Sequence, residues 1–415
     1  MSNLATVQAI SQLLSSQSLL AVVGGSVKQI TLSNLMDSMN VGQEALLREV
    51  AWGTYLEYNS TCDWPQIGNL TMRDTFYKQI GRYLVNNAGN AAKMNPVNSA
   101  YFADGTPVTA TKGHTMVRIP ELYYLVTTEN GSPILWQSMV PIGGNKVPER
   151  WIGAYKGAMG IADPTALVSR PDLVTADSRT ELQFWQAAQV NGKDWGLVNY
   201  NMRRELVMHH LGKFGSTNAQ AKVGIGLDGT GSSFDNERNI KTGLTVSLGD
   251  ATGTVNTVDA VAATVQQVSF LGMEGLWGQK WEFAPGIVSN AETVYIYDGN
   301  KAANDKPPVG VDYRIQTRLT SAGGSFISGM QLGPYCDMIP KAISGGSTSY
   351  WADGHWSAPS GELWLFGGSA SDGSICGLSA SYASYAFSLT GASVGARLAF
   401  YGTPKLVTGS ALMAM

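Results

Sequence analysis

Short apolar runs in the middle of the chain have the residue composition typical of β-strands. Val117, Ile119 and the block 122–126 form one such run, and 134–136 forms a second. Between the runs, Glu-Asn-Gly-Ser at 129–132 has the composition of a tight turn. The pattern predicts a β-hairpin.

Elsewhere the apolar residues recur at helical spacing, and the sequence predicts helices at 72–87, 181–189 and 202–215. Thr180 or Asp177 can cap the second of these helices. Gly215 lies where the third should stop, because glycine readily adopts the left-handed conformation that ends helices.

Short strands are expected at 151–155 and within 268–287 and 293–299, around Trp277 and Trp281, and the polar stretch 228–262 is expected to be a long loop or a polar hairpin. Strands and helices are mixed without a regular strand–helix–strand alternation. The fold class predicted from this order is therefore α+β.

The first 45 residues are expected to form short amphipathic pieces. Val27, Ile30 and Leu32 suit a short strand, and Ser33 precedes a possible short helix through Met36. A piece of this size folds poorly alone, so docking to a partner or self-association is the expected way to bury its apolar face.

The C-terminal stretch from 350 to 400 differs in composition from the rest of the chain. An aromatic cluster opens it, a strand-like run follows at 363–366, and residues 367–396 are then mostly Gly, Ser and Ala, with Asp372 as their one charge. Tyr on a Ser/Gly background is typical of binding loops. The alternative is a Gly/Ser linker, but linkers do not end in a strand-like run such as 397–400.

Composition and charge exclude several classes of protein. The chain has 415 residues, of which 44% are hydrophobic and 14% charged, and its net charge is -3. These values argue against disorder and against nucleic-acid binding. No apolar run is long enough for membrane insertion. The cysteines, Cys62, Cys336 and Cys376, are too widely spaced for a disulfide framework or a zinc site, which indicates synthesis in a reducing cytoplasm.

Two short motifs fit catalytic or nucleotide-binding patterns but lack the required context. Residues 224–229 match GxGxxG, yet a predicted helix precedes them and none follows directly, so we expect a turn. Residues 391–395 match GxSxG, yet a strand follows and no histidine lies further along. A hydrolase is therefore not expected.

The histidines and carboxylates do not suggest a catalytic or metal site either. His209 and His210 are adjacent on a predicted helix and point about 100° apart, so one is expected to pack or cap and the other to be exposed. The carboxylates form no calcium-binding run. We expect no enzyme activity, no metal ion and no cofactor.

A series of segments resembles one family. The series is MVRIPELYY (116–124), WIGAYKG (151–157), ELQFWQAAQVNGKDW (181–195), RRELVMHHLGKFGSTNAQ (203–220), VSFLGMEGLWGQKWEF (268–283) and the stretch 367–400 that ends in GARLAF. It is similar to phage tail-fibre and variable proteins with a C-type lectin fold in its formylglycine-generating-enzyme-like form. The cysteine pair of that enzyme and the calcium-dependent sugar motif of true C-type lectins are both missing, so neither activity is implied.

The resemblance implies a phage receptor-binding protein at a tail tip or fibre, usually a homotrimer, made in the host bacterial cytoplasm and carried on the virion. It implies a division into an attachment or oligomerisation region (1–45), a connecting region (46–110), a C-type lectin-like domain (111–405) and a tail (406–415). The expected partners are a host cell-surface protein or glycan, and other virion proteins through the N-terminal region.

In the subset of major tropism determinant type, a retroelement that mutates adenines diversifies the segment before GARL. That process does not produce Lys, Gln, Glu, Met or Trp, and residues 367–396 contain none of these five. By position in that pattern, the expected ligand-facing set is Ser369, Ser371, Asp372, Ile375, Ser379, Ser381, Tyr382, Ser384, Tyr385, Thr390 and Ser393, walled by Tyr350, Trp351, His355 and Trp356. Gly367, Gly368 and Gly395 are expected to be scaffold, and Arg397 to pair with a buried carboxylate. The alternative function is a structural virion component, such as a head fibre or baseplate decoration.

Overall fold

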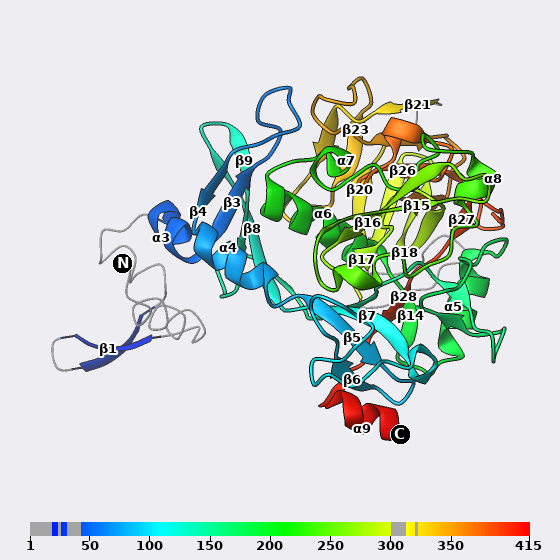
Figure 1. Cartoon of the computed structure of the whole chain (residues 1–415). Coiled ribbons are helices and arrows are strands. Elements are labelled where there is room, and N and C mark those ends of the chain that lie inside the picture. The colour runs from blue at the N-terminus through cyan, green and yellow to red at the C-terminus, as the bar shows by residue number, and fades with distance from the viewer. Residues whose placement is uncertain (1–18, 24–25, 31–42, 300–312, 320–322) are drawn as a thin grey trace.

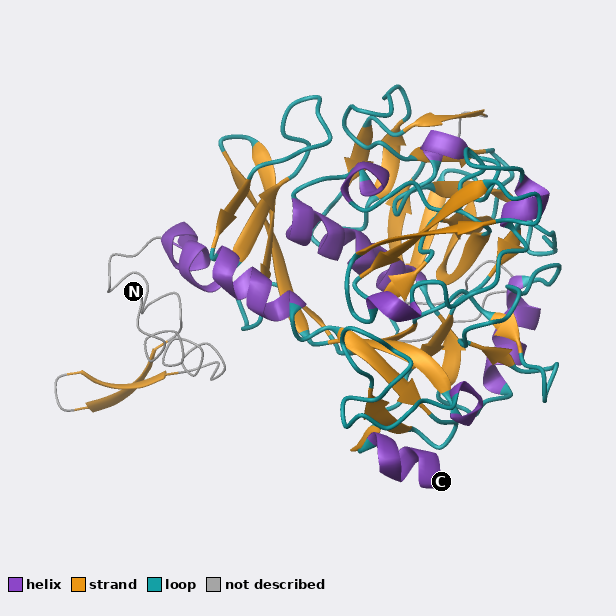
Figure 2. Cartoon of the chain, in the orientation of Figure 1, coloured by secondary structure: helices purple, strands orange, loops and turns teal. Residues whose placement is uncertain are grey.

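The computed structural model describes residues 19–23, 26–30, 43–299, 313–319 and 323–415. Strands predominate over helices in these residues (Figures 1 and 2). The mixed class predicted from the sequence is confirmed in this coarse form. At the N-terminal end, β1 (Leu19–Val23) and β2 (Ser26–Ile30) form an antiparallel pair. β2 includes Val27 and Ile30 of the predicted strand, and Leu32 lies outside the described residues. The short helix expected after Ser33 lies outside the described residues.

The N-terminal sheet joins strands from both sides of position 110. Its order is β10-β8-β9-β3-β4, with β3 (Trp52–Tyr55), β4 (Gln66–Gly68), β8 (Leu122–Glu129), β9 (Ser132–Ser138) and β10 (Asn145–Val147). The helices α3 (Gln43–Val50) and α4 (Leu70–Tyr77) lie beside it (Figure 1). The predicted hairpin is confirmed as β8 and β9. Asn130 and Gly131 both have positive φ, 49° and 85°, as the tightest hairpin turns require.

The middle sheet has the order β14-β28-β11-β7-β5-β6-β29. Its strands are β5 (Gly81–Val85), β6 (Asn90–Lys93), β7 (His114–Ile119), β11 (Arg150–Gly153), β14 (Trp195–Leu197), β28 (Leu398–Phe400) and β29 (Lys405–Val407). The predicted helix over 72–87 is wrong in its second half. The helix ends at Tyr77, and β5 is buried between β6 and β7. Burial between neighbouring strands outweighs the local helical spacing.

The C-terminal sheet has the order β20-β19-β18-β25-β26-β24-β21, and β27 also pairs with β18. Its strands are β18 (Trp281–Asn290), β19 (Thr293–Tyr297), β20 (Tyr313–Thr317), β21 (Gly323–Phe326), β24 (Gly354–Ser357), β25 (Leu363–Phe366), β26 (Ser381–Tyr385) and β27 (Val394–Gly395). The linker interpretation of the Gly/Ser-rich segment is therefore wrong, since β26 lies inside this sheet between β25 and β24.

Smaller strand groups and short helices complete the fold. The small strand groups are β12 (Ala158–Met159) with β13 (Leu167–Val168), β15 (Gly253–Val258) with β16 (Thr264–Phe270) and β17 (Met273–Glu274), and β22 (Gly329–Gln331) with β23 (Ile339–Ala342). The short helices are α7 (Ala219–Lys222), α8 (Phe234–Glu237), α9 (Gly409–Ala414), η1 (Ala110–Lys112), η2 (Val246–Leu248) and η3 (Gly373–Ile375). The polar stretch 228–262 thus holds α8, η2 and one strand of a hairpin.

Both predicted helices in 181–215 are confirmed. In α5 (Glu181–Gln189), Thr180 and not Asp177 is the cap, and Gln183 completes a capping box. The longer α6 (Tyr200–Phe214) ends at Gly215 in the left-handed conformation. It runs through the body between the sheets (Figure 2) and carries part of the largest core cluster.

The expectation that one of the two adjacent histidines is exposed is wrong. His209 and His210 are both buried. His209 stacks on Phe76 with ring centroids 5.6 Å apart, and the His210 Nδ1 lies 2.8 Å from the Ser216 carbonyl oxygen. A helix buried on all sides leaves neither ring a path to solvent.

Neither short motif has the context of a catalytic or nucleotide-binding element. Residues 224–229 form a loop in which Leu227 makes one bridge to Gly278, and no helix follows directly. In 391–395, Ser393 leads into β27 rather than into a helix. The structure agrees with the interpretation of 224–229 as a turn, and 391–395 lack the helix that a nucleophile elbow requires.

Candidate ligand-binding surface

The C-terminal segment is placed by strand pairing. β26 runs parallel to β24 and antiparallel to β25, and the register sets Trp356 directly beside Tyr382. Side chains on the same face of neighbouring strands are close enough to interact. The pairing therefore brings an aromatic residue from each strand to one place.

These aromatic residues form a stacked row, which we call the aromatic ladder: Trp356, Tyr382 and Tyr385. The rings of Trp356 and Tyr382 are stacked with centroids 5.4 Å apart, and those of Tyr382 and Tyr385 with centroids 4.8 Å apart. Trp281 meets Trp356 and Tyr382 edge-on, at 6.0 and 5.8 Å. Trp281 is buried, whereas the ladder is only partly buried. The ladder is thus partly open to solvent, whereas Trp281 lies beneath the surface.

A glycine on the neighbouring strand makes room for the ladder. Gly324 of β21 lies opposite Trp356. A Cβ atom at Gly324 would lie 1.8 Å from the Trp356 Cδ1 atom, far inside van der Waals contact. Only glycine allows the indole to lie over β21 in this way.

The loop before β26 is held by its own hydrogen bonds. The backbone N–H and the hydroxyl of Ser369 both donate to Asp372 Oδ2, at 2.7 and 2.8 Å, and the Ser369 and Ser371 hydroxyls lie 2.9 Å apart. Burial raises the pKa of Asp372, while the Ser369 hydrogen bonds lower it. Ser371 and Ser374 stay exposed at the surface of this loop.

After β26 the chain alternates in exposure. Phe387 and Leu389 are partly buried and pack against the core cluster beneath the ladder, while Ala386, Ser388 and Thr390 are exposed. Apolar side chains anchor the segment and small or hydroxylated side chains face solvent. This arrangement suits a surface whose outward residues can vary while its anchors stay fixed.

A buried ion network fixes both ends of the segment 367–396. Arg397 donates from Nη2 to Glu282 Oε1 at 2.8 Å, Lys156 Nζ lies 2.9 Å from the same oxygen, and Arg203 Nη1 lies 3.4 Å from Oε2. The expected pairing of Arg397 with a buried carboxylate is confirmed, and Glu282 is its partner. Arg203 also lies under Gly367, whose added Cβ would be 2.8 Å from Arg203 Nη2.

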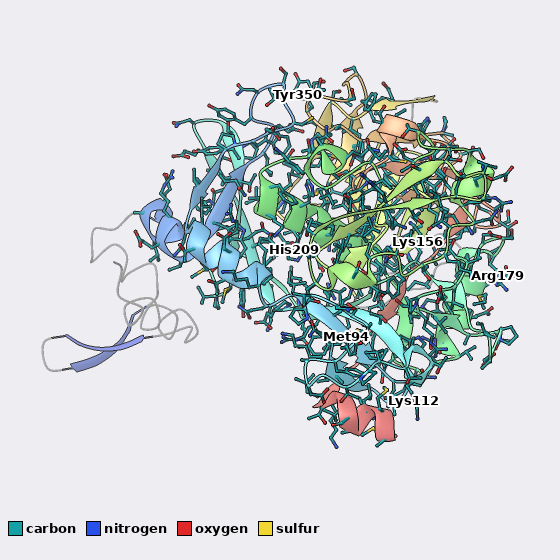
Figure 3. The ribbon with its side chains drawn as sticks, viewed as in Figure 1. Met94, Lys112, Lys156, Arg179, His209 and Tyr350 are labelled. Atoms are coloured by element: carbon teal, nitrogen blue, oxygen red, sulfur yellow. The ribbon has the colours of Figure 1, made fainter. Side chains whose placement is uncertain are left out.

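The cations of this network stabilise the charged form of Glu282. Burial alone would raise the pKa of Glu282, but the cations, Arg397 foremost, hold it at about 2. Burial lowers the pKa of Lys156 to about 8 although Glu282 opposes the shift. Figure 3 shows Lys156 inside the body, whereas Tyr350 lies at its upper edge. The network is a structural anchor, since its members are buried.

Part of the predicted ligand set lies at or near the surface. Its partly or fully exposed members are Tyr350, Trp356, Ser371, Asp372, Ile375, Tyr382, Ser384, Tyr385, Thr390 and Ser393. Tyr350, however, packs against the core cluster around α6 and not against the one beneath the ladder. Its expected place in the wall of the same site is therefore wrong.

The prediction is also wrong for the buried members, which are Trp351, His355, Ser369, Ser379 and Ser381. Trp351 packs edge-on against Trp64 at 5.4 Å. His355 Nδ1 lies 2.9 Å from the Ser381 hydroxyl, and burial lowers the pKa of this histidine to about 3. These side chains support the surface from below and cannot contact a ligand there.

The remaining buried serines bind neighbouring parts of the chain. Ser369 holds Asp372, and the backbone N–H of Ser379 donates to Asp353 at 2.7 Å. Trp281, Gly324, Ser374 and Ser388 were not predicted from the sequence. Ser374 and Ser388 lie in the same Ser-rich segment as the predicted set, so composition could have included them. The role of Gly324 depends on a strand pairing that its local sequence does not reveal.

The described residues hold no cluster of three or more His, Cys, Asp or Glu that could bind a metal ion. Cys62, Cys336 and Cys376 are free and buried, and burial raises the pKa of the Cys376 thiol well above its ordinary value. Among the described helices, none combines the length and apolar character needed to cross a lipid bilayer.

No protein-family profile and no curated protein matches the sequence. Solved structures with similarity to the chain include two variants of one protein. The Major Tropism Determinant P3c Variant has 16% sequence identity and a TM-score of 0.29, over 60% of this chain and 50% of that chain. The Major Tropism Determinant U1 Variant has 14% identity and a TM-score of 0.31, over 85% and 72%. The match thus spans half the length of the P3c variant, and scores this low identify no equivalent residues.

Proposed function

We propose that this chain is a receptor-binding protein of a phage virion, a tail-fibre or tail-tip adhesin that contacts the host cell through the aromatic ladder and the exposed residues of 367–396. The fold of residues 111–405 would be a C-type lectin-like scaffold. The observation that carries the proposal is the ladder itself: three stacked, partly exposed aromatic rings beside a row of exposed hydroxyl and small side chains.

The physical basis of the proposal is that different side chains of the segment have different roles. Tyrosine and tryptophan supply contact area at low entropic cost, and serine and threonine supply adaptable hydrogen bonds. The buried network of Glu282 holds the ends of the segment, so a change at an exposed position need not disturb the fold. Diversification of 367–396 by a retroelement would fit that arrangement and is part of the proposal.

The remaining parts of the proposal follow from the sequence resemblance. The N-terminal region would dock to another virion protein, and the assembled adhesin would be a homotrimer made in the bacterial cytoplasm. Linked copies would raise the avidity of individually weak sites. The partner would be a host cell-surface protein or glycan.

Selective labelling of a single introduced cysteine tests the proposal. The native cysteines are buried, so a bulky maleimide should react only with Ser388→Cys, beside the ladder, or with the control Leu406→Cys, which is exposed on β29 of the middle sheet. Labelled Ser388→Cys should lose binding to bacterial cells that the wild-type protein binds, and labelled Leu406→Cys should keep it. Equal binding by both labelled proteins would favour a structural virion component.

A further inference from the structure

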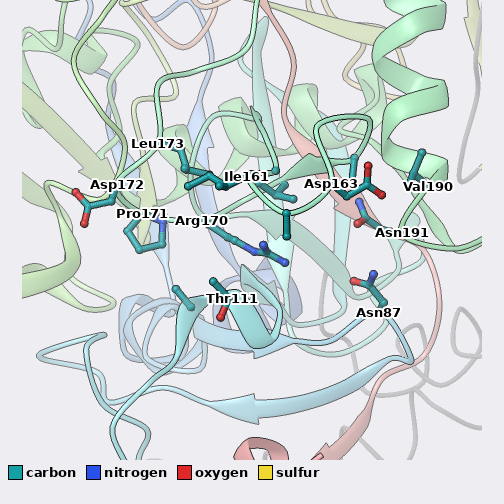
Figure 4. Close-up of a pocket in the computed structure, with 15 residues that line it drawn as sticks. Asn87, Thr111, Ile161, Asp163, Arg170, Pro171, Asp172, Leu173, Val190 and Asn191 are labelled. Atoms are coloured by element: carbon teal, nitrogen blue, oxygen red, sulfur yellow. The ribbon is translucent and has the colours of Figure 1, made fainter.

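A cavity lies away from the ladder, and no residue of 367–396 lines it. Its volume is about 570 Å³, and it opens between the loop that follows β12, the end of α5 and the turn at η1 (Figure 4). Arg170 extends across it, with Thr111 and Asn87 on one side and Ile161 and Asp163 on the other. A cavity of this size is large enough for a small organic ligand.

Arg170 is the cationic side chain that lines this cavity, and it has no carboxylate partner among the described residues. Its Nε donates to the Gly113 carbonyl oxygen at 2.7 Å, which leaves its Nη atoms without a hydrogen bond inside the described chain. Burial is the one cause that lowers the pKa of Arg170. A half-buried guanidinium with free donors favours a planar anion that can accept two parallel hydrogen bonds.

Two amide side chains add uncharged hydrogen-bonding groups. The buried His114 is neutral, since burial lowers its pKa to about 3, and its Nε2 lies 2.8 Å from Asn87 Oδ1. Because that oxygen can only accept, the Nδ2 of Asn87 remains as a donor. In Asn191 the amide nitrogen is the atom already used, since its Nδ2 donates to the Leu167 carbonyl oxygen at 2.7 Å. The Oδ1 of Asn191 therefore remains as an acceptor.

The rim restricts the charge of the ligand. Asp163 and Asp172 both line the cavity, and these two carboxylates repel a multiply charged anion more strongly than an anion with a single charge. The wall is otherwise largely apolar, and Ile161 is 85% exposed on it. The best fit is therefore a molecule with one planar carboxylate, several hydroxyl groups and an apolar ring face.

We propose that this cavity binds an acidic sugar residue, with the carboxylate on the guanidinium of Arg170, ring hydroxyls on Asn87, Asn191 and Thr111, and the apolar ring face against Ile161. The site is separate from the aromatic ladder and does not depend on the function proposed for it. If both sites operate, the chain contacts a host surface with an acidic polysaccharide at two places.

Binding of sodium glucuronate, measured by saturation-transfer NMR and calorimetry on the full chain, tests this site. Glucose has the same ring without the carboxylate and is the first comparison; inorganic phosphate is the second. Wild-type protein should bind glucuronate at least about tenfold more tightly than either, as expected for a charge-assisted bidentate contact. No saturable binding at millimolar glucuronate, equal binding of glucose, or tighter binding of phosphate would overturn the proposal.

Two variants locate the site. Arg170→Gln removes the charge, and Ile161→Asp adds a negative charge at an exposed position where folding should not suffer. Both should weaken glucuronate binding at least about tenfold, whereas Val258→Asp, a matched change at an exposed position outside the cavity, should not. The Tyr382→Ala/Tyr385→Ala protein should bind glucuronate as wild type does. Unchanged binding by Ile161→Asp, or loss in the tyrosine variant, would contradict the site.

Discussion

Replacing Glu282 by glutamine should strongly lower the unfolding free energy, because Glu282 is the carboxylate of the buried ion network that anchors the C-terminal segment. The side chain keeps its size and loses its charge, which leaves Arg397, Lys156 and Arg203 as buried cations without a counter-ion. Removing one partner of a buried ion pair typically costs about 3–5 kcal/mol. Here one carboxylate serves three cations, so the loss should lie at the upper end of that range.

The pKa of Glu282 gives a separate measure of the same interaction. It is about 2 in the folded chain against an ordinary value of 4.5, which corresponds to about 3 kcal/mol of stability at neutral pH. Because the folded-state pKa is depressed, the unfolded chain takes up this proton first in acid. The contribution is therefore present above pH 4.5 and is lost as the pH falls towards 2. The Glu282→Gln variant should lack this acid-dependent loss.

Urea unfolding followed by tryptophan fluorescence, at neutral pH and at several acidic pH values, measures both effects. Glu49→Gln, a matched change at an exposed helix position, should stay within about 0.5 kcal/mol of wild type. Adding Lys156→Met to Glu282→Gln should recover on the order of 1 kcal/mol, because it removes one uncompensated buried cation. A Glu282→Gln protein as stable as wild type, or one with the wild-type response to acid, would refute this account of the anchor.

Three further predictions concern the fold around the surface. Gly324→Ala should cost about 1–3 kcal/mol in unfolding free energy because its Cβ collides with Trp356. Gly391 has open space around it, so Gly391→Ala should leave the unfolding free energy unchanged. Equal stability of the two variants would contradict the packing of Trp356 over Gly324. Thr180→Ala should cost about 1 kcal/mol by removing the α5 cap, and an unchanged denaturation midpoint would argue against the capping box. All four histidines are buried, and their pKa values are about 3 to 4 against an ordinary value of 6.5. The unfolded chain therefore takes up protons first below pH 6.5, and the unfolding free energy should fall from neutral pH to about pH 5. Equal unfolding free energies at the two pH values would contradict the burial of neutral histidines.

Local features of the fold could be predicted from the sequence because their causes are local. The turn at Asn130 and Gly131 requires residues that tolerate positive φ, and the Thr180 cap and the stop at Gly215 depend on neighbouring backbone groups. The sequence predicts a helix where β5 lies because the partners of this strand, β6 and β7, are not visible in its own residue pattern. Strand pairing decided its conformation.

The candidate surface was only partly predictable for the same reason. The composition of 367–396 identified the segment and the two tyrosines of the ladder, but it could not separate exposed serines from buried ones. Ser381 is buried because β24 places His355 beside it. Likewise, the carboxylate partner of Arg397 lies 115 positions away in the chain, and no spacing rule connects the two.

The most direct test of the proposed function is adsorption of the purified protein to host cells. Wild type is compared with Tyr382→Ala/Tyr385→Ala and with Tyr58→Ala/Tyr101→Ala, which removes two exposed tyrosines elsewhere; light scattering and thermal unfolding check that assembly and stability are kept. The account predicts that the ladder variant loses adsorption while the control keeps it. Full adsorption by a folded ladder variant would contradict receptor binding at this surface.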